Sequence, residues 1–269
     1  MNRCHSLVGP IWILLLEFTF AGAAASQKTA GMVLIPAGDF EQHIEYRWRE
    51  GLSLDPLIVD DAGRRYRSRE KVYVPAFYID KTEVTNQSYR EFLDATAYEP
   101  EWPGNFLKHW KDGAFPEDLA DHPVVWVSME DARAYARWAG KRLPTEVEWQ
   151  KAAQGPDGLT WPWGNVYDPG RANFDSKGTR PVGSYSEGAS PYGVFDLAGN
   201  VWEMTDSFQS DGYHYFSWLR GGSFYFAKGS RWYMQGGPIT SRQRAKYWYM
   251  TPALNRSPTI GFRCVREAE

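Results

Sequence analysis

The sequence predicts a mixed α+β protein of one compact domain with little regular secondary structure. Its 13 Trp, 16 Tyr and 14 Phe residues exclude long disorder, because a solvated chain does not carry so many aromatic side chains. The 25 Gly and 17 Pro residues favour short elements and long ordered loops, which argues against a helical bundle or a coiled coil. At 269 residues the chain can bury a substantial core, and no linker divides residues 30–269.

Residues 1–25 have the pattern of a secretory signal peptide. Arg3 supplies a positive start, residues 11–16 (IWILLL) an apolar segment and residues 23–25 (AAA) a small-residue cleavage site. The alternative is an N-terminal anchor that is not cleaved. Glu17 leaves the apolar run short and polar for a membrane span, so we expect a secreted or periplasmic protein without a stable span after cleavage.

The two cysteines, Cys4 and Cys264, lie on opposite sides of the cleavage site. Cleavage leaves Cys264 alone, so no internal disulfide can form in the mature chain. The fold is then held by packing or by a metal.

Extended segments are expected at residues 31–40 and 72–80, the first as an opening strand and hairpin around a Pro-Ala-Gly turn. Between them, residues 41–70 are rich in Arg and Glu and predict a charged surface excursion. That excursion is either a solvated loop or a loop that binds a partner.

Three helices follow, each introduced by a capping residue. The first begins at Thr85, the second runs from Ser128 to a stop at Gly140, and the third runs from Thr145 to just before Gly155. An acidic residue three positions after the second and third caps favours a capping box. The rest of the chain predicts short strands and ordered loops.

Charge and motifs exclude several classes of function. With 30 Lys and Arg against 33 Asp and Glu, the chain has no basic excess for nucleic acid. It also lacks the HExxH, CxxC, Walker and GxSxG motifs. Two tripeptides, at residues 86–88 and 255–257, match the N-glycosylation sequon.

Several segments, taken together, resemble one family. They are FYIDKTEVTN at 77–86, HPVV at 122–125, RLPTEVEW at 142–149, DLAGNVWE at 196–203, RGGS at 220–223 and GFRC at 261–264. In this order they are similar to the formylglycine-generating enzyme, or sulfatase-modifying factor, family. The resemblance covers nearly all of residues 30–269 and implies a single domain with a C-type-lectin-like fold.

The resemblance also implies where copper would bind. In active oxidases of the family, two cysteines shortly after Gly-Gly-Ser hold copper(I), which selects sulfur ligands. Here Phe226 stands at the first of these positions and Arg231 stands near the second. Neither side chain can ligate copper(I). We therefore expect no copper site and no typical formylglycine-generating activity, and catalytic residues are not identified.

A structural calcium site is implied at residues 196–203. The family pattern places carboxylates at Asp196 and Glu203 and backbone carbonyls at Gly199 and Val201, an all-oxygen set that suits a hard cation. The alternative is that the two carboxylates only accept hydrogen bonds from loop amides. Whether iron binds is left open.

The family's substrate cleft corresponds to residues 220–250. Aromatic and arginine side chains there could hold an extended peptide, stack on a ring or clamp a carboxylate, and each could instead pack in the core. The candidates are Ser223, Tyr225, Arg231, Trp232, Arg242, Arg244, Tyr247 and Trp248.

Two hypotheses for function follow. The favoured one is an exported binding or accessory factor with a peptide, protein or small-molecule ligand in the cleft. The alternative is a divergent oxidoreductase acting in the oxidative maturation of a secreted peptide, siderophore or protein. Kinship of fold does not choose between them, because function resides in the site.

Overall fold

The computed structural model describes residues 29–45, 67–210, 212–226 and 239–268. The expected signal peptide and residues 46–66 of the expected excursion lie outside them. Residues 33–269 form one compact unit. Its strands and helices are β1 (Met32–Ile35), β2 (Gly38–Glu45), β3 (Arg67–Val74), β4 (Phe77–Asp80), α2 (Asn86–Thr96), α3 (Met129–Trp138), α4 (Glu146–Gln154), β5 (Trp202–Ser210), β6 (Tyr215–Arg220), β7 (Ala245–Tyr249), α5 (Pro252–Asn255), β8 (Ile260–Gly261) and β9 (Val265–Glu267).

The described strands form three small sheets, with the orders β1-β4-β9, β2-β3 and β7-β6-β5-β8. The expected hairpin over residues 31–40 is wrong, because β1 and β2 belong to different sheets. The Pro-Ala-Gly turn redirects the chain, and β2 instead finds an eight-residue antiparallel partner in β3. Because of that pairing, the charged excursion covers fewer residues than the expected 41–70. Residues 41–45 and 67–70, expected to be part of it, are paired strand.

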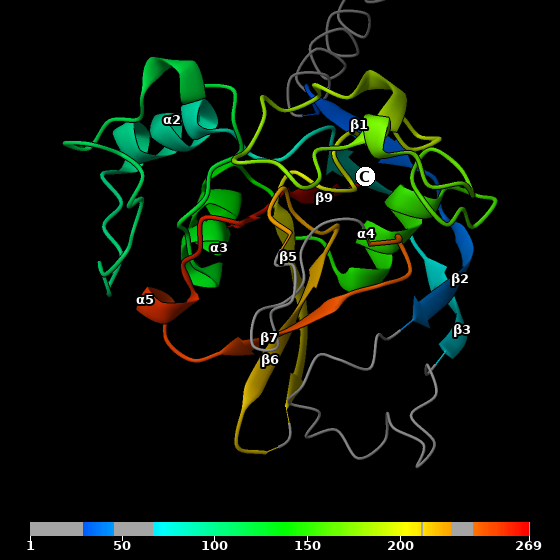
Figure 1. The fold of residues 1–269 in the computed structure, drawn as a ribbon. Coiled ribbons are helices and arrows are strands. Elements are labelled where there is room, and N and C mark those ends of the chain that lie inside the picture. Colours follow the sequence, from blue (N-terminus) through cyan, green and yellow to red (C-terminus); the bar gives the residue numbers. More distant parts are fainter. Residues whose placement is uncertain (1–28, 46–66, 211, 227–238, 269) are drawn as a thin grey trace, which may run out of the picture. The chain divides into compact units, whose positions relative to one another are not determined.

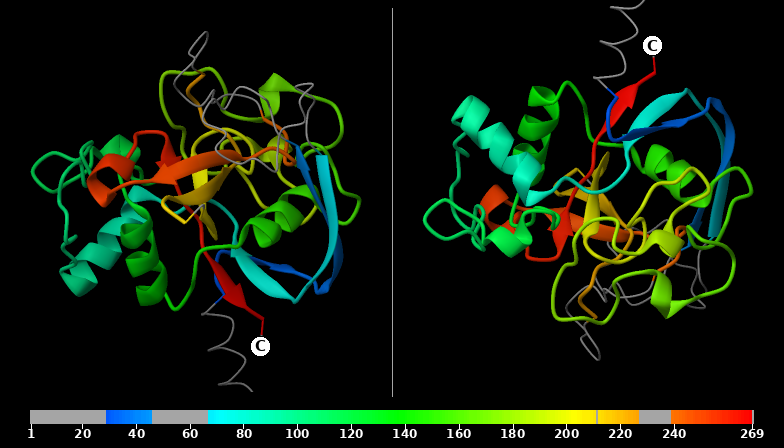
Figure 2. Two further views of the ribbon diagram at one scale, coloured as in Figure 1. Left: turned by 90° about the horizontal axis from the view of Figure 1, so that it is seen from below. Right: turned by 90° about the horizontal axis from the view of Figure 1, so that it is seen from above.

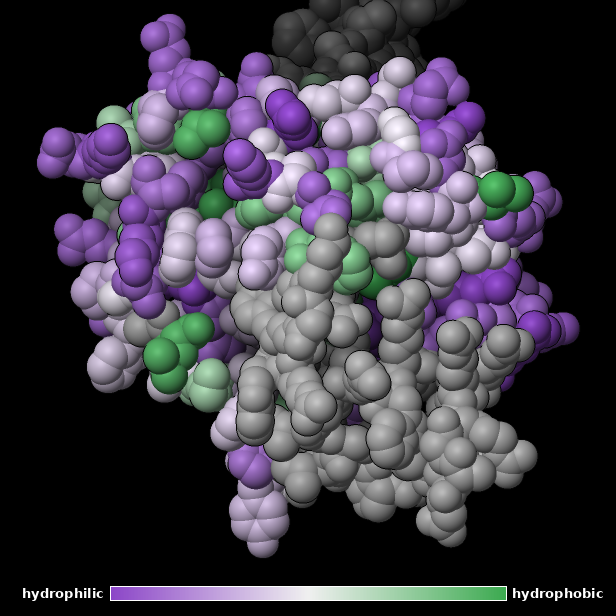
Figure 3. Space-filling model, viewed as in Figure 1, coloured by the Kyte–Doolittle hydropathy of each residue, from purple (hydrophilic) through white to green (hydrophobic). Residues whose placement is uncertain are grey.

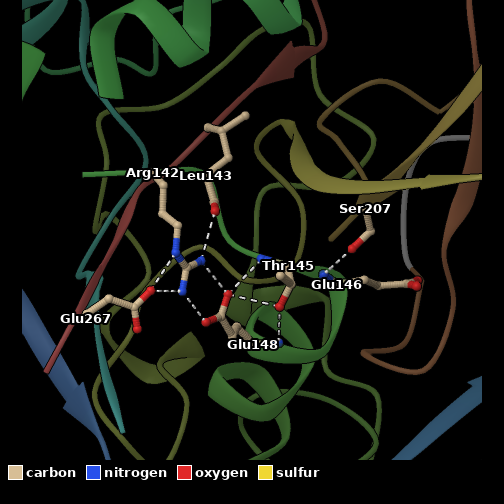
Figure 4. Close-up of polar contacts among 7 residues, drawn as sticks. All are labelled: Arg142, Leu143, Thr145, Glu146, Glu148, Ser207 and Glu267. Carbon is tan, nitrogen blue, oxygen red and sulfur yellow. Dashed lines mark hydrogen bonds and ion pairs between the residues drawn. The ribbon is translucent and has the colours of Figure 1, made fainter. Parts of the chain in front are cut away.

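The helix starts follow the capping pattern. Thr85 caps α2, and full capping boxes join Ser128 to Asp131 at α3 and Thr145 to Glu148 at α4. At α4, Figure 4 shows Glu148 also paired with Arg142, at 2.6 Å. The beginnings of all three helices are therefore confirmed. No helix in the described ranges is long and apolar enough to cross a bilayer.

Two groups of buried side chains make the core. One gathers α2 and α3 against β5, β6 and the end of the chain, around Tyr89, Phe92 and Phe262. The other packs α4 against β1 to β4, around Trp149 and Ile79. Figures 1 and 2 show these helices on opposite sides of the β5–β6–β7 strands, with α2 and α3 on one side and α4 on the other. The sheet therefore lies between the two groups.

Long loops fill much of the second half, as expected. Between α4 and β5 the described chain has only two short turns of 3₁₀ helix, at Pro169–Arg171 and Ser186–Gly188.

Both sequon asparagines are buried and hydrogen-bonded. The side chain of Asn86 donates to the carbonyls of Leu119 and His122, and that of Asn255 donates to the carbonyl of Trp248. Neither asparagine is accessible in the folded chain.

Candidate functional site

The turn after β6 carries the positions that hold copper in the oxidases that the sequence resembles. Gly221 and Gly222 adopt φ of 85° and 80°, left-handed values that glycine tolerates. Ser223 is buried, and its hydroxyl donates to the carbonyl of Tyr225 at 3.3 Å. Tyr225 is 45% exposed, and Phe226 is half-buried. Arg231 and Trp232, also predicted for this region, lie outside the described residues.

Cys264 cannot supply a thiolate to this turn. It lies in the apolar core with no exposed surface, and its backbone N–H donates to the Asp80 carboxylate at 2.8 Å. Burial first, and then the charge of Asp80, raise the pKa of the Cys264 thiol well above its usual value. The residue is a neutral, buried thiol.

A buried ion-pair cluster lies at the start of α4. The Glu146 carboxylate pairs with Arg220, at 3.3 Å, and with Arg244. Each guanidinium also stacks on a tryptophan: Arg220 lies 5.1 Å from the Trp149 ring centre and Arg244 lies 3.5 Å from that of Trp218. Arg244, predicted as a ligand clamp, is therefore engaged inside the chain.

Arg242 is engaged as well. One Nη donates to the carbonyl of Gly158 at 3.0 Å and the other lies 4.0 Å from the Glu45 carboxylate. Next to it, the Gln150 side chain donates to the carbonyls of His43 and Ser241. These contacts tie residues 240–245 to β2 and α4, so the two arginines hold this segment in place.

Glu146 was not among the candidate residues predicted from the sequence. Figure 4 shows its side chain directed away from the Arg142–Glu148 pair. Its N–H donates to the Ser207 hydroxyl at 2.9 Å, which fixes the first turn of the helix. Glu146, Gln150 and Gln154 are spaced by four, hence on one helix face, and all three are buried. The spacing alone does not reveal this, because a polar helix face ordinarily meets solvent.

The remaining cleft candidates lie on opposite faces of β7. The Tyr247 hydroxyl donates to the Asn255 carbonyl, so this side chain faces α5. Trp248 is 42% exposed, and its ring lies 5.1 Å from that of His214. The six candidates that the structure describes therefore do not form one cluster, and Tyr225 and Trp248 are the exposed ones among them.

Residues 196–201 form a tight loop that leads into β5. Asp196, Gly199 and Asn200 have φ of 58°, 81° and 56°. At Gly199 an added Cβ would lie 2.5 Å from the Asn173 carbonyl oxygen, so glycine is required there.

The carboxylates of this loop are bound to donors of the chain itself. Arg263 donates to both oxygens of Glu203, at 2.6 and 2.7 Å, and the Trp149 indole N–H donates at 2.8 Å. Asp196 accepts the Gly183 N–H at 2.6 Å. Glu203, with its charge neutralised and both oxygens occupied, does not fit the expected ligand set, and the loop-amide alternative describes Asp196. No group of three His, Cys, Asp or Glu side chains in the described ranges could hold a metal.

A third buried carboxylate, Glu83, accepts a hydrogen bond from the Asn200 side chain of this loop and was not among the residues predicted from the sequence. Burial, and then the neighbouring Asp196 charge, raise its pKa well above the usual value. Burial also raises the pKa of Asp196. Because Glu83 belongs to the matched segment 77–86, the resemblance itself was the available signal.

Comparisons with known proteins identify the family. Residues 17–268 match the Sulfatase-modifying factor enzyme 1-like domain. The chain is 32% identical to the inactive C-alpha-formylglycine-generating enzyme 2 of Bos taurus, over 90% of this chain and 89% of that protein. It is 35% identical to the hercynine oxygenase of Mycolicibacterium smegmatis, over 65% and 45% of the two chains. It spans 42%, 23% and 34% of the length of three other curated relatives.

The fold has close structural counterparts. PvdO from Pseudomonas aeruginosa superposes with a TM-score of 0.58 over 88% of this chain and 94% of PvdO, at 21% identity. The predicted fold class is therefore confirmed. By its sequence match and its fold, the chain belongs to the family of the Sulfatase-modifying factor enzyme 1-like domain.

Proposed function

We propose that this protein is an exported binding or accessory factor of the family, without typical formylglycine-generating activity. The observation that carries the proposal is that the chain has no cysteine able to hold copper(I) beside Ser223. Its cysteines are Cys4 and Cys264, and Cys264 is a buried neutral thiol in the core. Copper(I) held by two thiolates then has no ligands beside Ser223.

The match to a relative described as inactive supports this proposal, because it extends over most of both chains. Exposed aromatic side chains supply the means of binding. Tyr225 and Trp248 can stack on an extended peptide or on a small molecule with a flat ring. On the face in Figure 3 the hydrophobic residues of the described surface lie in small separate groups. A ligand of mixed polarity fits that face better than a broad apolar one.

The activity test uses purified mature protein, copper(I), oxygen and a sulfatase-type Cys-x-Pro-x-Arg peptide. We expect no aldehyde by mass spectrometry, while a two-cysteine oxidase of the family, assayed in parallel, produces it. Aldehyde formation at a comparable rate would refute the proposal.

The binding test uses the same peptide with a fluorescent label. Anisotropy should show binding, and Y225A and W248A should each weaken it by about fivefold or more, as expected for aromatic contacts at an interface. Y73A is the control, because Tyr73 is 64% exposed on the separate β2–β3 sheet. If Y225A and W248A bind as tightly as Y73A, these aromatic residues are not the binding surface.

The alternative, a divergent oxidoreductase, is favoured by the similarity to hercynine oxygenase. Metal analysis of the untreated protein, followed by oxygen consumption with thiol and phenolic substrates, tests it. Iron or copper near one equivalent together with turnover would establish this alternative. Protein without either metal and without turnover supports the binding role.

A further inference from the structure

One end of the β5–β6–β7 sheet carries a group of large side chains that are exposed to solvent. With one residue of the adjoining helix α5 they form a surface that we call the hairpin face. Its members are Phe208, Tyr213, Tyr215, Met250 and Leu254. In Figure 1 the turn between β5 and β6 extends well beyond α3 and α4, so these helices do not cover the hairpin face.

The strand register brings the aromatic rings of the hairpin face together. Tyr215 of β6 pairs with Tyr249 of β7, and Phe208 of β5 pairs with Ser217 of β6. Directly paired residues, and residues two apart in one strand, point to the same side of a sheet, so Phe208, Tyr215 and Tyr249 share one side. The ring centres of Phe208 and Tyr249 lie 6.4 Å apart, with the rings at 89°. The three rings are therefore neighbours on one surface.

Helix α5 extends the same surface. The Tyr247 hydroxyl, which lies on the same side of β7 as Tyr249, donates to the carbonyl of Asn255 at the end of α5. The Asn255 side chain in turn accepts the N–H of Met250 at 3.2 Å. These bonds hold α5, and with it the 64%-exposed Leu254, on the side of β7 that carries the aromatic rings.

The charged groups that the structure places against the hairpin face neutralise each other. The Arg133 guanidinium lies 4.9 Å from the centre of the Phe208 ring and pairs with the Asp206 carboxylate. A surface with neither charge in excess meets a copy of itself without like-charge repulsion, and it has little attraction for a highly charged partner. Tyrosine hydroxyls both donate and accept hydrogen bonds, so those of Tyr213 and Tyr215 can pair with the same groups of a second copy.

The exposed area is large enough for two copies to associate. At about 200 Å² for each large side chain, the exposed fractions of the five residues, from 40% to 91%, amount to roughly 600 Å². An interface of standard size buries about 800 Å² on each partner, and the half-buried Arg133 and Tyr249 at the edge of the face contribute further area.

We propose that the hairpin face is the interface of a homodimer, in which the same face of two copies meets about a two-fold axis. Aromatic residues, Met and Arg, the residue types that dominate this face, are enriched in protein interfaces. The proposal does not depend on the proposed binding function. Trp248, which serves that function, points to the opposite side of β7 from Tyr249.

The experiment is sedimentation velocity of the purified mature protein at concentrations up to about 100 μM, since interfaces of standard size reach micromolar affinity or better. We expect a monomer–dimer equilibrium that depends on concentration. Y215D and L254D should each raise the dimer dissociation constant about tenfold or more, because each places a carboxylate inside an apolar contact. Y73D is the matched control and should dimerise as the wild type does, because Tyr73 is 64% exposed on β3 in a separate sheet.

Oxidation of Met250 by hydrogen peroxide supplies a second measurement. This side chain is 48% exposed in the single chain, so its oxidation should slow severalfold as the wild type is concentrated and should stay constant in Y215D. Three results would overturn the proposal. They are a wild type that stays monomeric at the highest concentration, variants Y215D and L254D that dimerise as tightly as Y73D, and assemblies larger than a dimer, which require two different surfaces to meet.

Discussion

Replacing Glu146 with glutamine tests whether the buried ion-pair cluster holds residues 240–245 against α4. The side chains of Arg220, Glu146 and Arg244 are 0%, 6% and 12% exposed, so solvent screens their charges little. Removing the charge of one partner in a buried pair costs about 3–5 kcal/mol, because the other charge stays buried without its counterion. Glutamine keeps one acceptor oxygen, so we expect E146Q to lose about 3 kcal/mol of unfolding free energy.

The assay is urea unfolding followed by tryptophan fluorescence, with E267Q as the matched control. Glu267 pairs with Arg142 at 2.6 Å, but its carboxylate is 66% exposed and the guanidinium 36%. An exposed pair contributes about 0–1 kcal/mol, so E267Q should change stability by less than 1 kcal/mol. If E146Q costs no more than E267Q, burial does not strengthen the Glu146 cluster, and the account of how residues 240–245 are held is wrong.

Three further outcomes are expected. Expression in a glycosylating eukaryotic host should add no N-glycan at Asn86 or Asn255, by intact mass, because both are buried; a modified folded protein would contradict their placement. Cys264 should resist a thiol reagent until urea unfolds the chain. Because the fold raises the pKa of this thiol, its contribution to the unfolding free energy is complete below the pKa of the unfolded thiol. The unfolding free energy should therefore fall as pH rises above about 8.5. Burial lowers the pKa of His109 to about 4, so the unfolded chain binds more protons below about pH 6.5 and stability should fall from there towards pH 4. An NMR titration of His109 near pH 6.5 would refute this.

Local chemistry made the helices predictable. An N-cap hydroxyl at Thr85, Ser128 or Thr145 satisfies backbone N–H groups within three residues of itself, so each helix start depends on its immediate neighbours. The strands were harder to predict. The segment after Pro36 had the pattern of a hairpin, but its strand partner lies beyond residue 66, and pairing over that distance is decided by which long-range contacts bury most surface.

At the candidate site, too, some features were determined by the sequence and others by the tertiary structure. The sequence alone determined that no cysteine follows Ser223 at the positions of the copper ligands, because folding cannot replace a residue that the sequence lacks. The charge partners were decided by tertiary structure: Arg244 meets Glu146 across 98 positions, and Glu203 meets Arg263 across 60. A buried charge pairs with whichever opposite charge the packing brings within a few ångströms, and spacing along the chain does not encode that distance. The absence of the copper ligands was therefore readable from the sequence, whereas the ion pair of Glu203 with Arg263 and the burial of Glu83 required the folded chain.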